Sequence, residues 1–469
     1  MEWLILFGAG WVIYTIVNKF NGKSEAKNNN YPLPQHTYTP KPRLNVKHID
    51  VSDIKLSSEQ QELFNKLENT KNHIFITGKA GTGKSLLLQY FRQHSSKRLV
   101  VVAPTGVAAL NVNGQTIHSL FKIRPGFNSK ENLRINSKTA LLLKNIDAVV
   151  IDEISMVRAD LIDSIDYILK RARLNDDPFG GVQMIMFGDL YQLPPVVESA
   201  ELHKYFADNH GGFYFFNGHA WKNVPLEITE LKTIFRQKDE DFKNILNSIR
   251  TGQMDVNLLD QLNQRVKIEI PSNGVITLAT TNQSVNEINE KQLSQLEEKI
   301  FEYKATIIGD LRPPYPTEET LHLKKGAQVM LMKNDKEKRW VNGTLGYIES
   351  LADKEIKANI DGIVYSVPQE TWNKINYYYN RETRKIEEEV ISSFTQFPLR
   401  LAWAITVHKS QGQTYGSVVV DMGDGAFAHG QTYVALSRCK SLDGLYLKRE
   451  LLHQDIIVDP SIITFMNKT

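Results

Sequence analysis

Residues 73–91, HIFITGKAGTGKSLLLQYF, decide the fold of this 469-residue chain. An apolar run at 73–77 leads directly into the glycine-rich segment 78–85, and a helix-like stretch follows. This strand–loop–helix order is the context that a phosphate-binding loop requires. The glycines let backbone N–H groups turn towards phosphate oxygens, and the N-terminus of the following helix adds positive potential. The stretch therefore predicts an α/β domain that binds a nucleotide.

The side chains at the end of this loop have separate chemical tasks. Lys84 is expected to reach the β- and γ-phosphates, and the hydroxyl of Ser85 is expected to ligate Mg²⁺. The predicted ligands are therefore ATP and Mg²⁺. The other loop residues expected to bind the nucleotide are Gly78, Gly81, Thr82 and Gly83.

Two further apolar strands end in polar residues. Strand 147–151 delivers Asp152 and Glu153, and strand 183–187 leads to Gln192 in the loop GDLYQLPP. Ligands bind at the carboxyl ends of parallel strands, so these side chains are expected beside the phosphate loop. Asp152 would hold Mg²⁺, Glu153 would activate the attacking water, and Gln192 would sense the γ-phosphate or orient the water. A structural hydrogen bond is the alternative role for Gln192.

Apolar runs and helical patterns alternate from residue 58 onward, and no period of 20–50 residues recurs. This alternation predicts parallel sheets rather than a solenoid. Residues 325–396 differ, because short alternating strands and turn signals such as NGT and DG predict a small β-barrel inserted in a second α/β domain. The other predicted strands are 98–103 in the first domain and 275–279, 401–406 and 417–421 in the second.

The composition is that of a globular protein, with 41% hydrophobic and 23% charged residues. Cys439 is the single cysteine, so an internal disulfide and zinc sites built on cysteine pairs are excluded. Six basic and two acidic side chains give residues 1–48 a charge of +4, which leaves −1 of the formal total of +3 for residues 49–469. Net charge alone therefore does not indicate a nucleic-acid partner.

The N-terminal segment 3–17, WLILFGAGWVIYTIV, carries no charge. As a helix it spans about 22 Å, which is less than the roughly 30 Å hydrocarbon core. Continuation to Phe20, with Lys19 reaching the interface, brings the helix near the lower limit for a span. The lysines that follow predict an outside N-terminus and a cytoplasmic catalytic body tethered to the lipid bilayer through residues 3–20. A buried helix and a cleaved signal are the alternatives.

Taken in order along the chain, the motifs resemble those of the petite-integration-frequency family of superfamily 1 helicases and its RecD-like relatives. The stretch 157–177 is similar to this family's own signature region, which favours it over the RecD-like relatives. The other matching stretches are LSSEQQ (57–62), GKAGTGKS (78–85), APTGVAAL (103–110), GQTIHSLF (114–121), IDEISM (151–156), PFGGVQMIMFGDLYQLPPV (178–196), LKTIFRQ (231–237), LATTNQSVNEIN (278–289), GAQVMLMKND (326–335), AWAITVHKSQGQT (402–414) and GQTYVALSRC (430–439).

The resemblance implies an α/β fold of two RecA-like P-loop domains with parallel sheets, plus a small β-barrel insert in the second. Relatives carry a small wedge between the two early motifs of the first domain, here about residues 121–137. The expected division is a hydrophobic segment (1–20), a polar linker rich in Pro and Asn (21–50), a first RecA-like domain (51–225), a second one (226–324 and 397–469) and the insert (325–396).

The resemblance also implies nucleotide contacts outside the loop. Gln60 would contact adenine, and Arg236 and Arg438 would be arginine fingers that reach from the far domain, so ATP would lie between two lobes. A finger of this kind is worth about 10³–10⁵ in rate on analogous enzymes. By pattern alone, each arginine would more simply form a surface salt bridge.

The resemblance further implies contacts with single-stranded DNA from loops of both lobes. The expected activity is ATP-dependent DNA unwinding with 5′-to-3′ movement on single-stranded DNA, with DNA forks as a partner; an obligate protein partner cannot be inferred. The alternatives are a membrane-tethered P-loop switch that binds a protein partner and a motor for RNA or RNA–DNA hybrids. The expected DNA contacts, each of which could instead be an ordinary polar loop residue, are Thr105, His118, His408, Lys409 and Ser410.

Overall fold

The computed structural model of the chain describes residues 55–127, 132–237 and 239–467. The expected anchor 1–20 and linker 21–50 lie outside these residues, as does part of the expected wedge. Among the residues that are described, no helix is both long and apolar enough to cross a bilayer.

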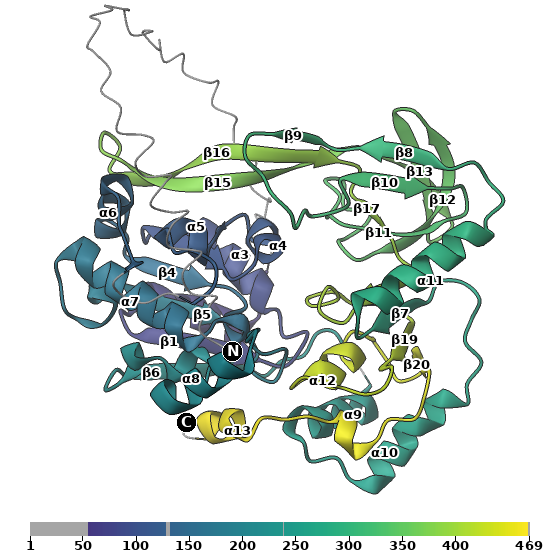
Figure 1. The fold of residues 1–469 in the computed structure, drawn as a ribbon, viewed down its shortest axis with the longest axis horizontal. Helices are drawn as coiled ribbons and strands as arrows, with labels where there is room; N and C mark the ends of the chain where they lie inside the picture. The colour runs from purple at the N-terminus through teal and green to yellow at the C-terminus, as the bar shows by residue number, and fades with distance from the viewer. Residues whose placement is uncertain (1–54, 128–131, 238, 468–469) are drawn as a thin grey trace, which may run out of the picture. The chain divides into compact units, whose positions relative to one another are not determined.

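A six-stranded, entirely parallel sheet forms the centre of the first lobe, residues 55–231 (Figure 1). Its order is β3-β2-β4-β5-β1-β6, and the strands predicted at 73–77, 98–103 and 183–187 are confirmed. The strands are β1 (His73–Gly78), β2 (Leu99–Ala103), β3 (Gln115–Thr116), β4 (Ala148–Ile151), β5 (Gln183–Phe187) and β6 (Leu226–Leu231). The helices are α2 (Ser58–Asn69), α3 (Lys84–His94), α4 (Gly106–Asn111), α5 (Ile117–Phe121), α6 (Ser137–Lys144), α7 (Ala159–Arg173) and α8 (Ala200–His210).

Alternate residues of these strands bury opposite faces of the sheet, as the two-residue period of a strand requires. Ile74 and Ile76 pack with the apolar side chains of α2 and α3. Phe75, between them, belongs to the cluster that includes the apolar side chains of α5, α6 and α7. Because helices cover both faces, the four inner strands are largely apolar, which is why the sequence shows continuous runs rather than alternation there.

The second lobe, residues 239–295 and 404–447, contains a four-stranded parallel sheet of order β18-β7-β19-β20. The single strand predicted at 401–406 is wrong. The chain leaves the antiparallel strand β17 at Leu401 and enters the parallel strand β18 at Ala404, so a continuous apolar run serves two different sheets. The elements are β7 (Ile276–Ala279), β18 (Ala404–Thr406), β19 (Val418–Asp421), β20 (Leu445–Leu447), α9 (Glu240–Thr251), α10 (Val256–Asn263), α11 (Asn282–Gln295) and α12 (Gln431–Leu436).

Antiparallel sheets fill the insert, residues 301–401. The five-stranded sheet has the order β14-β13-β12-β11-β17, and β15 and β16 form a long hairpin that pairs with β9 (Figure 1). The strands are β8 (Phe301–Lys304), β9 (Thr306–Ile308), β10 (Thr320–Leu323), β11 (Gln328–Leu331), β12 (Leu345–Ala352), β13 (Glu355–Ile360), β14 (Ile363–Val367), β15 (Glu370–Asn380), β16 (Lys385–Gln396) and β17 (Leu399–Leu401).

Two parallel sheets with an antiparallel insert between them confirm the expected fold class. Three expected boundaries are misplaced, one at the end of the first domain and one at each end of the insert. Residues 226–231 form β6, which pairs with β1, so the first sheet continues past residue 225. Antiparallel pairing begins at Phe301 and ends at Leu401, on both sides of the expected insert. Strands that pair lie far apart in sequence, so the local pattern of residue types could not locate these domain boundaries.

Candidate nucleotide site and strand-contacting loops

The phosphate loop joins β1 to α3 in a backbone form that only glycine adopts easily. Gly81 has φ 87° and Gly83 has φ 80°. A Cβ at Gly81 would lie 2.4 Å from the Cβ of Arg236, and one at Gly83 would lie 2.5 Å from Nε2 of Gln60. The glycines therefore allow both an inward-turned backbone and close packing of neighbouring segments against it.

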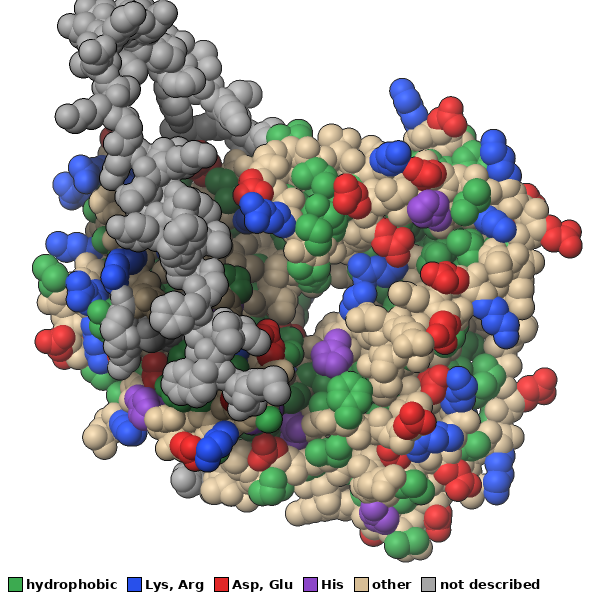
Figure 2. Space-filling view, viewed as in Figure 1, with side chains coloured by type: hydrophobic (Ala, Val, Ile, Leu, Met, Phe, Trp, Pro, Cys, Tyr) green, Lys and Arg blue, Asp and Glu red, His purple; other side chains and the backbone are tan. Residues whose placement is uncertain are grey.

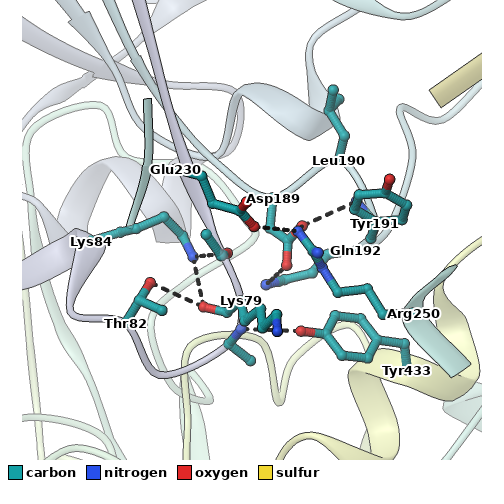
Figure 3. A network of polar contacts seen from close by, with 12 residues as sticks. Lys79, Thr82, Lys84, Asp189, Leu190, Tyr191, Gln192, Glu230, Arg250 and Tyr433 are labelled. Atoms are coloured by element: carbon teal, nitrogen blue, oxygen red, sulfur yellow. Dashed lines mark hydrogen bonds and ion pairs between the residues drawn. The ribbon is translucent and has the colours of Figure 1, made fainter. Parts of the chain in front are cut away.

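Lys84 begins α3 and folds over the loop. Its Nζ donates to the carbonyl oxygens of Gly78 (2.6 Å) and Lys79 (3.2 Å), as Figure 3 shows. Burial lowers the pKa of Lys84, although the charges of Asp189 and Glu153 oppose the shift. The amine is thus held at the phosphate loop with carboxylates nearby.

Asp152 and Glu153 follow β4, the second neighbour of β1 in the sheet. Burial and the adjacent charge of Glu153 raise the pKa of Asp152. Burial also raises the pKa of Glu153, against the charges of Lys84 and Arg438. Glu153 has φ 52°, a left-handed conformation that is unusual outside glycine and clusters at functional sites. A carboxyl of raised pKa is suited to accept a proton from water.

The residues present fit a magnesium nucleotide. Ser85 is exposed at the second position of α3, and its hydroxyl together with the Asp152 carboxylate supplies the oxygen donors that Mg²⁺ prefers. Thr82 and Gln60 are buried instead: the Thr82 hydroxyl donates to Lys79 O at 3.0 Å, and Gln60 Nε2 donates to Thr82 O at 3.4 Å. These two side chains therefore support the loop backbone.

Gln192 lies in the loop after β5, beside a buried carboxylate. Its Nε2 donates to Asp189 Oδ2 at 3.4 Å, and its Oε1 accepts from Gln411 Nε2 at 3.3 Å. Gln411 directly follows the expected DNA-contacting residues 408–410. Gln192 therefore connects a loop of the first lobe to a loop of the second.

Arg236 contacts the phosphate loop, but it does not come from the far domain as expected. It follows β6 of the first sheet, and its backbone and Cβ pack on Gly81. Its guanidinium donates to Ser437 O (3.1 Å) and Gly412 O (3.3 Å) of the second lobe. Burial, together with the charge of Arg438, lowers the pKa of Arg236 to about 9.

Arg438 does belong to the second lobe and is 1% exposed, which excludes the surface salt bridge. Burial lowers the pKa of its guanidinium, although the charge of Glu153 opposes the shift. Its hydrogen-bond acceptors are Val434 O, Ser410 O, Gln413 O and Ser437 Oγ.

The expected DNA contacts differ in accessibility. His408 and Lys409 are exposed, and His118 is half-buried, with a pKa lowered by burial and by the charge of Arg158. The Thr105 hydroxyl caps α4 by accepting from Ala108 N. Ser410 is fully buried and its hydroxyl donates to Val407 O, so it stabilises the turn and presents nothing to a strand.

Sequence reasoning missed several side chains at the nucleotide site. Tyr433 of α12 accepts from Ala80 N at 3.1 Å, and Arg250 of α9 donates to Asp189. Phe235 is 55% exposed, and its ring lies 3.8 Å from where a Cβ of Gly83 would be. A signal existed for Arg250, because it lies four and eight residues after the buried Leu246 and Phe242 and so continues the apolar face of its helix.

Similarity to known proteins agrees with this geometry. Residues 55–258 match the family model described as PIF1-like helicase, and residues 311–351 match that of the 2B domain of DNA helicase Pif1. The ATP-dependent DNA helicase Pif1 of Bdellovibrio bacteriovorus is 31% identical, over 89% of this chain and 93% of its own length. The ATP-dependent DNA helicase PIF1 of Xenopus laevis is 32% identical over 84% of this chain, which spans only 61% of that relative's length.

Solved structures show the same fold. Bacteroides sp. Pif1 in complex with ADP-AlF4 superposes with a TM-score of 0.83 at 38% identity, over 89% of this chain and 97% of that one. Bacteroides Pif1 bound to single-stranded DNA has the same identity and coverage but a TM-score of 0.64. The identity and coverage of these relatives, together with the shared phosphate loop and sheets, show that the chain belongs to the PIF1-like helicase family.

Proposed function

We propose that this chain is an ATP-dependent DNA helicase, which couples ATP hydrolysis between two RecA-like lobes to movement on single-stranded DNA and to opening of forks. The observation that carries the proposal is the meeting of both lobes at the phosphate loop, where Tyr433 bonds to Ala80 N. A nucleotide bound there can draw the lobes together, and closure can move a strand held by both. The DNA-bound Bacteroides relatives support DNA as the polymer.

The residue roles follow from the site. Lys84 binds the β- and γ-phosphates, and Ser85 and Asp152 would hold Mg²⁺, which neutralises developing charge when bound. Glu153 takes the proton of the attacking water, and Gln192 orients that water. Arg236 and Arg438 stabilise charge at the transferred phosphoryl group, and Arg438 must exchange some of its carbonyl partners to reach it. Gly78, Gly81, Thr82 and Gly83 bind through the backbone, with Gln60 behind them and near adenine.

The proposed strand path uses Thr105 and His118 of the first lobe and His408 and Lys409 of the second. Lys and Arg side chains are interspersed with Asp and Glu over the insert and second lobe (Figure 2). On the described residues of the face that Figure 2 shows, the basic side chains do not gather into one patch, and we assign the grip to individually placed loops. The proposed domains are 55–231, 239–295 with 404–447, and the insert 301–401, and the proposed direction is 5′ to 3′.

Unwinding of duplexes with matched 5′ or 3′ tails tests the proposal. We expect ATPase activity that rises strongly with single-stranded DNA, and unwinding only of the 5′-tailed duplex. An ATPase rate indifferent to DNA and RNA would overturn the helicase and favour a switch that binds a protein. Greater stimulation by an RNA strand of the same sequence would favour the RNA motor.

We also propose that residues 3–20 tether the chain to lipid, because the segment is uncharged up to Asn18 and lysines follow it. Flotation of the full chain with liposomes should be lost on deletion of residues 1–20. Equal flotation of both proteins would contradict the tether and leave the helicase proposal untouched.

A further inference from the structure

Arg250 belongs to helix α9 of the second lobe, but its guanidinium contacts side chains of the first lobe. Its Nη2 donates to Asp189 Oδ1 at 3.2 Å and lies 3.6 Å from Glu230 Oε1. The guanidinium carbon is 4.1 Å from the centre of the Tyr191 ring. Figure 3 shows these side chains converging beside the phosphate loop. The side chain of Arg250 is 7% exposed, and that of Asp189 is 0% exposed.

The guanidinium of Arg250 is charged. Burial disfavours the charged guanidinium, but the charges of Asp189 and Glu230 outweigh burial and raise the pKa of Arg250. A charged guanidinium accordingly neutralises the buried Asp189 carboxylate. Without it, Asp189 would keep backbone and amide donors but lose the cation that is bonded to it.

Asp189 in turn holds the loop that carries Gln192. Its Oδ1 accepts from Tyr191 N at 3.2 Å, and its Oδ2 accepts from Gln192 Nε2 at 3.4 Å. With its Nε2 bound in this way, the amide of Gln192 has a defined orientation. Arg250 therefore acts on Gln192 through one shared carboxylate.

Arg250 differs from Arg236 in what it contacts: its guanidinium lies against carboxylates of the first lobe, whereas the guanidinium of Arg236 donates to carbonyl oxygens of the second. In the second lobe, Tyr433 accepts from Ala80 N of the phosphate loop and Ser437 O accepts from Arg236, while Arg250 on α9 bonds to Asp189. Its bond to Asp189 joins the two lobes, so it depends on how the second lobe is docked on the first.

We propose that Arg250 is a positioning residue: by binding Asp189 across the lobe interface, it orients Gln192 for hydrolysis only when the second lobe is docked. This inference rests on the proposed ATPase function. It explains why a cation is buried in an otherwise apolar helix face, where an apolar side chain would pack as well.

Arg250→Met tests the inference in steady-state ATPase assays with saturating single-stranded DNA. We expect kcat to fall by about 10- to 100-fold, as a misoriented group does, with KM for ATP and affinity for a fluorescent ADP analogue changed less than about 3-fold. Arg265→Met is the matched control, because Arg265 also lies over a tyrosine ring but bonds carbonyls within its own lobe. Its kcat should stay at the wild-type value.

Two double variants separate positioning from mere support. The double variant Asp189→Asn with Arg250→Met removes both charges. It should regain the unfolding temperature that Arg250→Met alone loses, while its kcat stays low. Recovery of kcat in this double variant would overturn the proposal. Gln192→Ala with Arg250→Met should be no slower than Gln192→Ala alone, whereas multiplied losses would overturn it. A wild-type chain without DNA-stimulated ATPase would refute the proposed function, whereas an active wild type with an unaffected Arg250→Met refutes only this inference.

Discussion

Two of the long-range contacts that the first lobe makes differ in their chemistry. At the nucleotide site, the second lobe contacts loop backbone and charged groups through Tyr433, Arg250 and the carbonyls that hold Arg236. At the hairpin, β15 and β16 contact regular strands and helices of the first lobe. There Tyr377 Oη accepts from Val101 N, and Arg92 donates to Glu388 at 2.6 Å.

The different chemistry suggests different tasks: the contact at the nucleotide site serves hydrolysis, and the contact at the hairpin serves stability. Loop groups at the nucleotide site can respond to phosphate, because their donors and acceptors are those that a nucleotide would use. The hairpin contact involves no residue of the phosphate loop, although Arg92 lies on the helix that follows it. Substitutions in the first contact should therefore change kcat, and those in the second should change the free energy of unfolding.

The largest effect is expected for Arg438→Ala. Loss of an arginine finger should reduce DNA-stimulated kcat by about 10³–10⁵-fold, because charge on the transferred phosphoryl group is left without its cation. Stopped-flow phosphate release measures this loss. A reduction below tenfold would show that Arg438 only ties Val434, Ser410 and Gln413 together, and the contrast between the two contacts would weaken.

The second largest effect is expected for Lys84→Ala. Its DNA-stimulated kcat should fall by about 10²–10³-fold, as for removal of one preorganised donor at a charged transition state. The same assay measures it, with binding of a fluorescent ADP analogue as the second reading. Lys97→Ala is the control, since that lysine bonds carbonyls at the opposite end of the first lobe's core. Equal losses in both variants would indicate damage to the fold rather than to the site.

Glu388→Gln tests the hairpin side. The side chains of Arg92 and Glu388 are 10% and 16% exposed, so loss of the charge should reduce the free energy of unfolding by about 1–3 kcal/mol. Urea unfolding measures this change, and kcat should stay within about twofold of wild type. Glu389→Gln, at an exposed neighbouring position, is the control. A large fall in kcat would show that the hairpin contact also serves hydrolysis.

The smallest effect concerns pH. His429 Nε2 lies 2.8 Å from Leu190 O, and its Nδ1 accepts from Asp459 N, so the folded state holds a neutral ring. Burial lowers its pKa below 6.5, although Leu190 O, Asp459 and Asp189 oppose the shift. A depressed pKa gives stability that is complete above pH 6.5 and is lost as the pH falls through the folded-state value.

Unfolding between pH 7.5 and 5.5 checks this sign. As the pH is lowered, the free energy of unfolding of the wild type should decrease, and that of His429→Asn should decrease less steeply. Partial loss of solvent also lowers the pKa values of His73, His118 and His408, and these groups maintain the remaining slope. His453→Asn, at an exposed position, should follow the wild type, and a steeper fall in His429→Asn would contradict the assignment.

Local pattern predicted the phosphate loop, Asp152, Glu153 and most strands, because each depends on residues adjacent in sequence. The family resemblance added Arg236 and Arg438, whose surroundings in sequence give no sign of a buried arginine. The pattern failed where an apolar run served two sheets, at 401–406, and where a polar residue was buried, at Ser410. In both places the deciding contacts come from distant segments.

By itself, then, the sequence determined the phosphate chemistry and the alternation of strands and helices, since glycine freedom, helix termini and apolar periodicity are local properties. Only the tertiary structure decided that β6 joins the first sheet, that Arg236 reaches the phosphate loop from the first lobe, and that Arg250 pairs with Asp189. Asp189 and Arg250 are 61 residues apart in the chain. Pairing across such a separation depends on how whole lobes pack, and no local pattern encodes that packing.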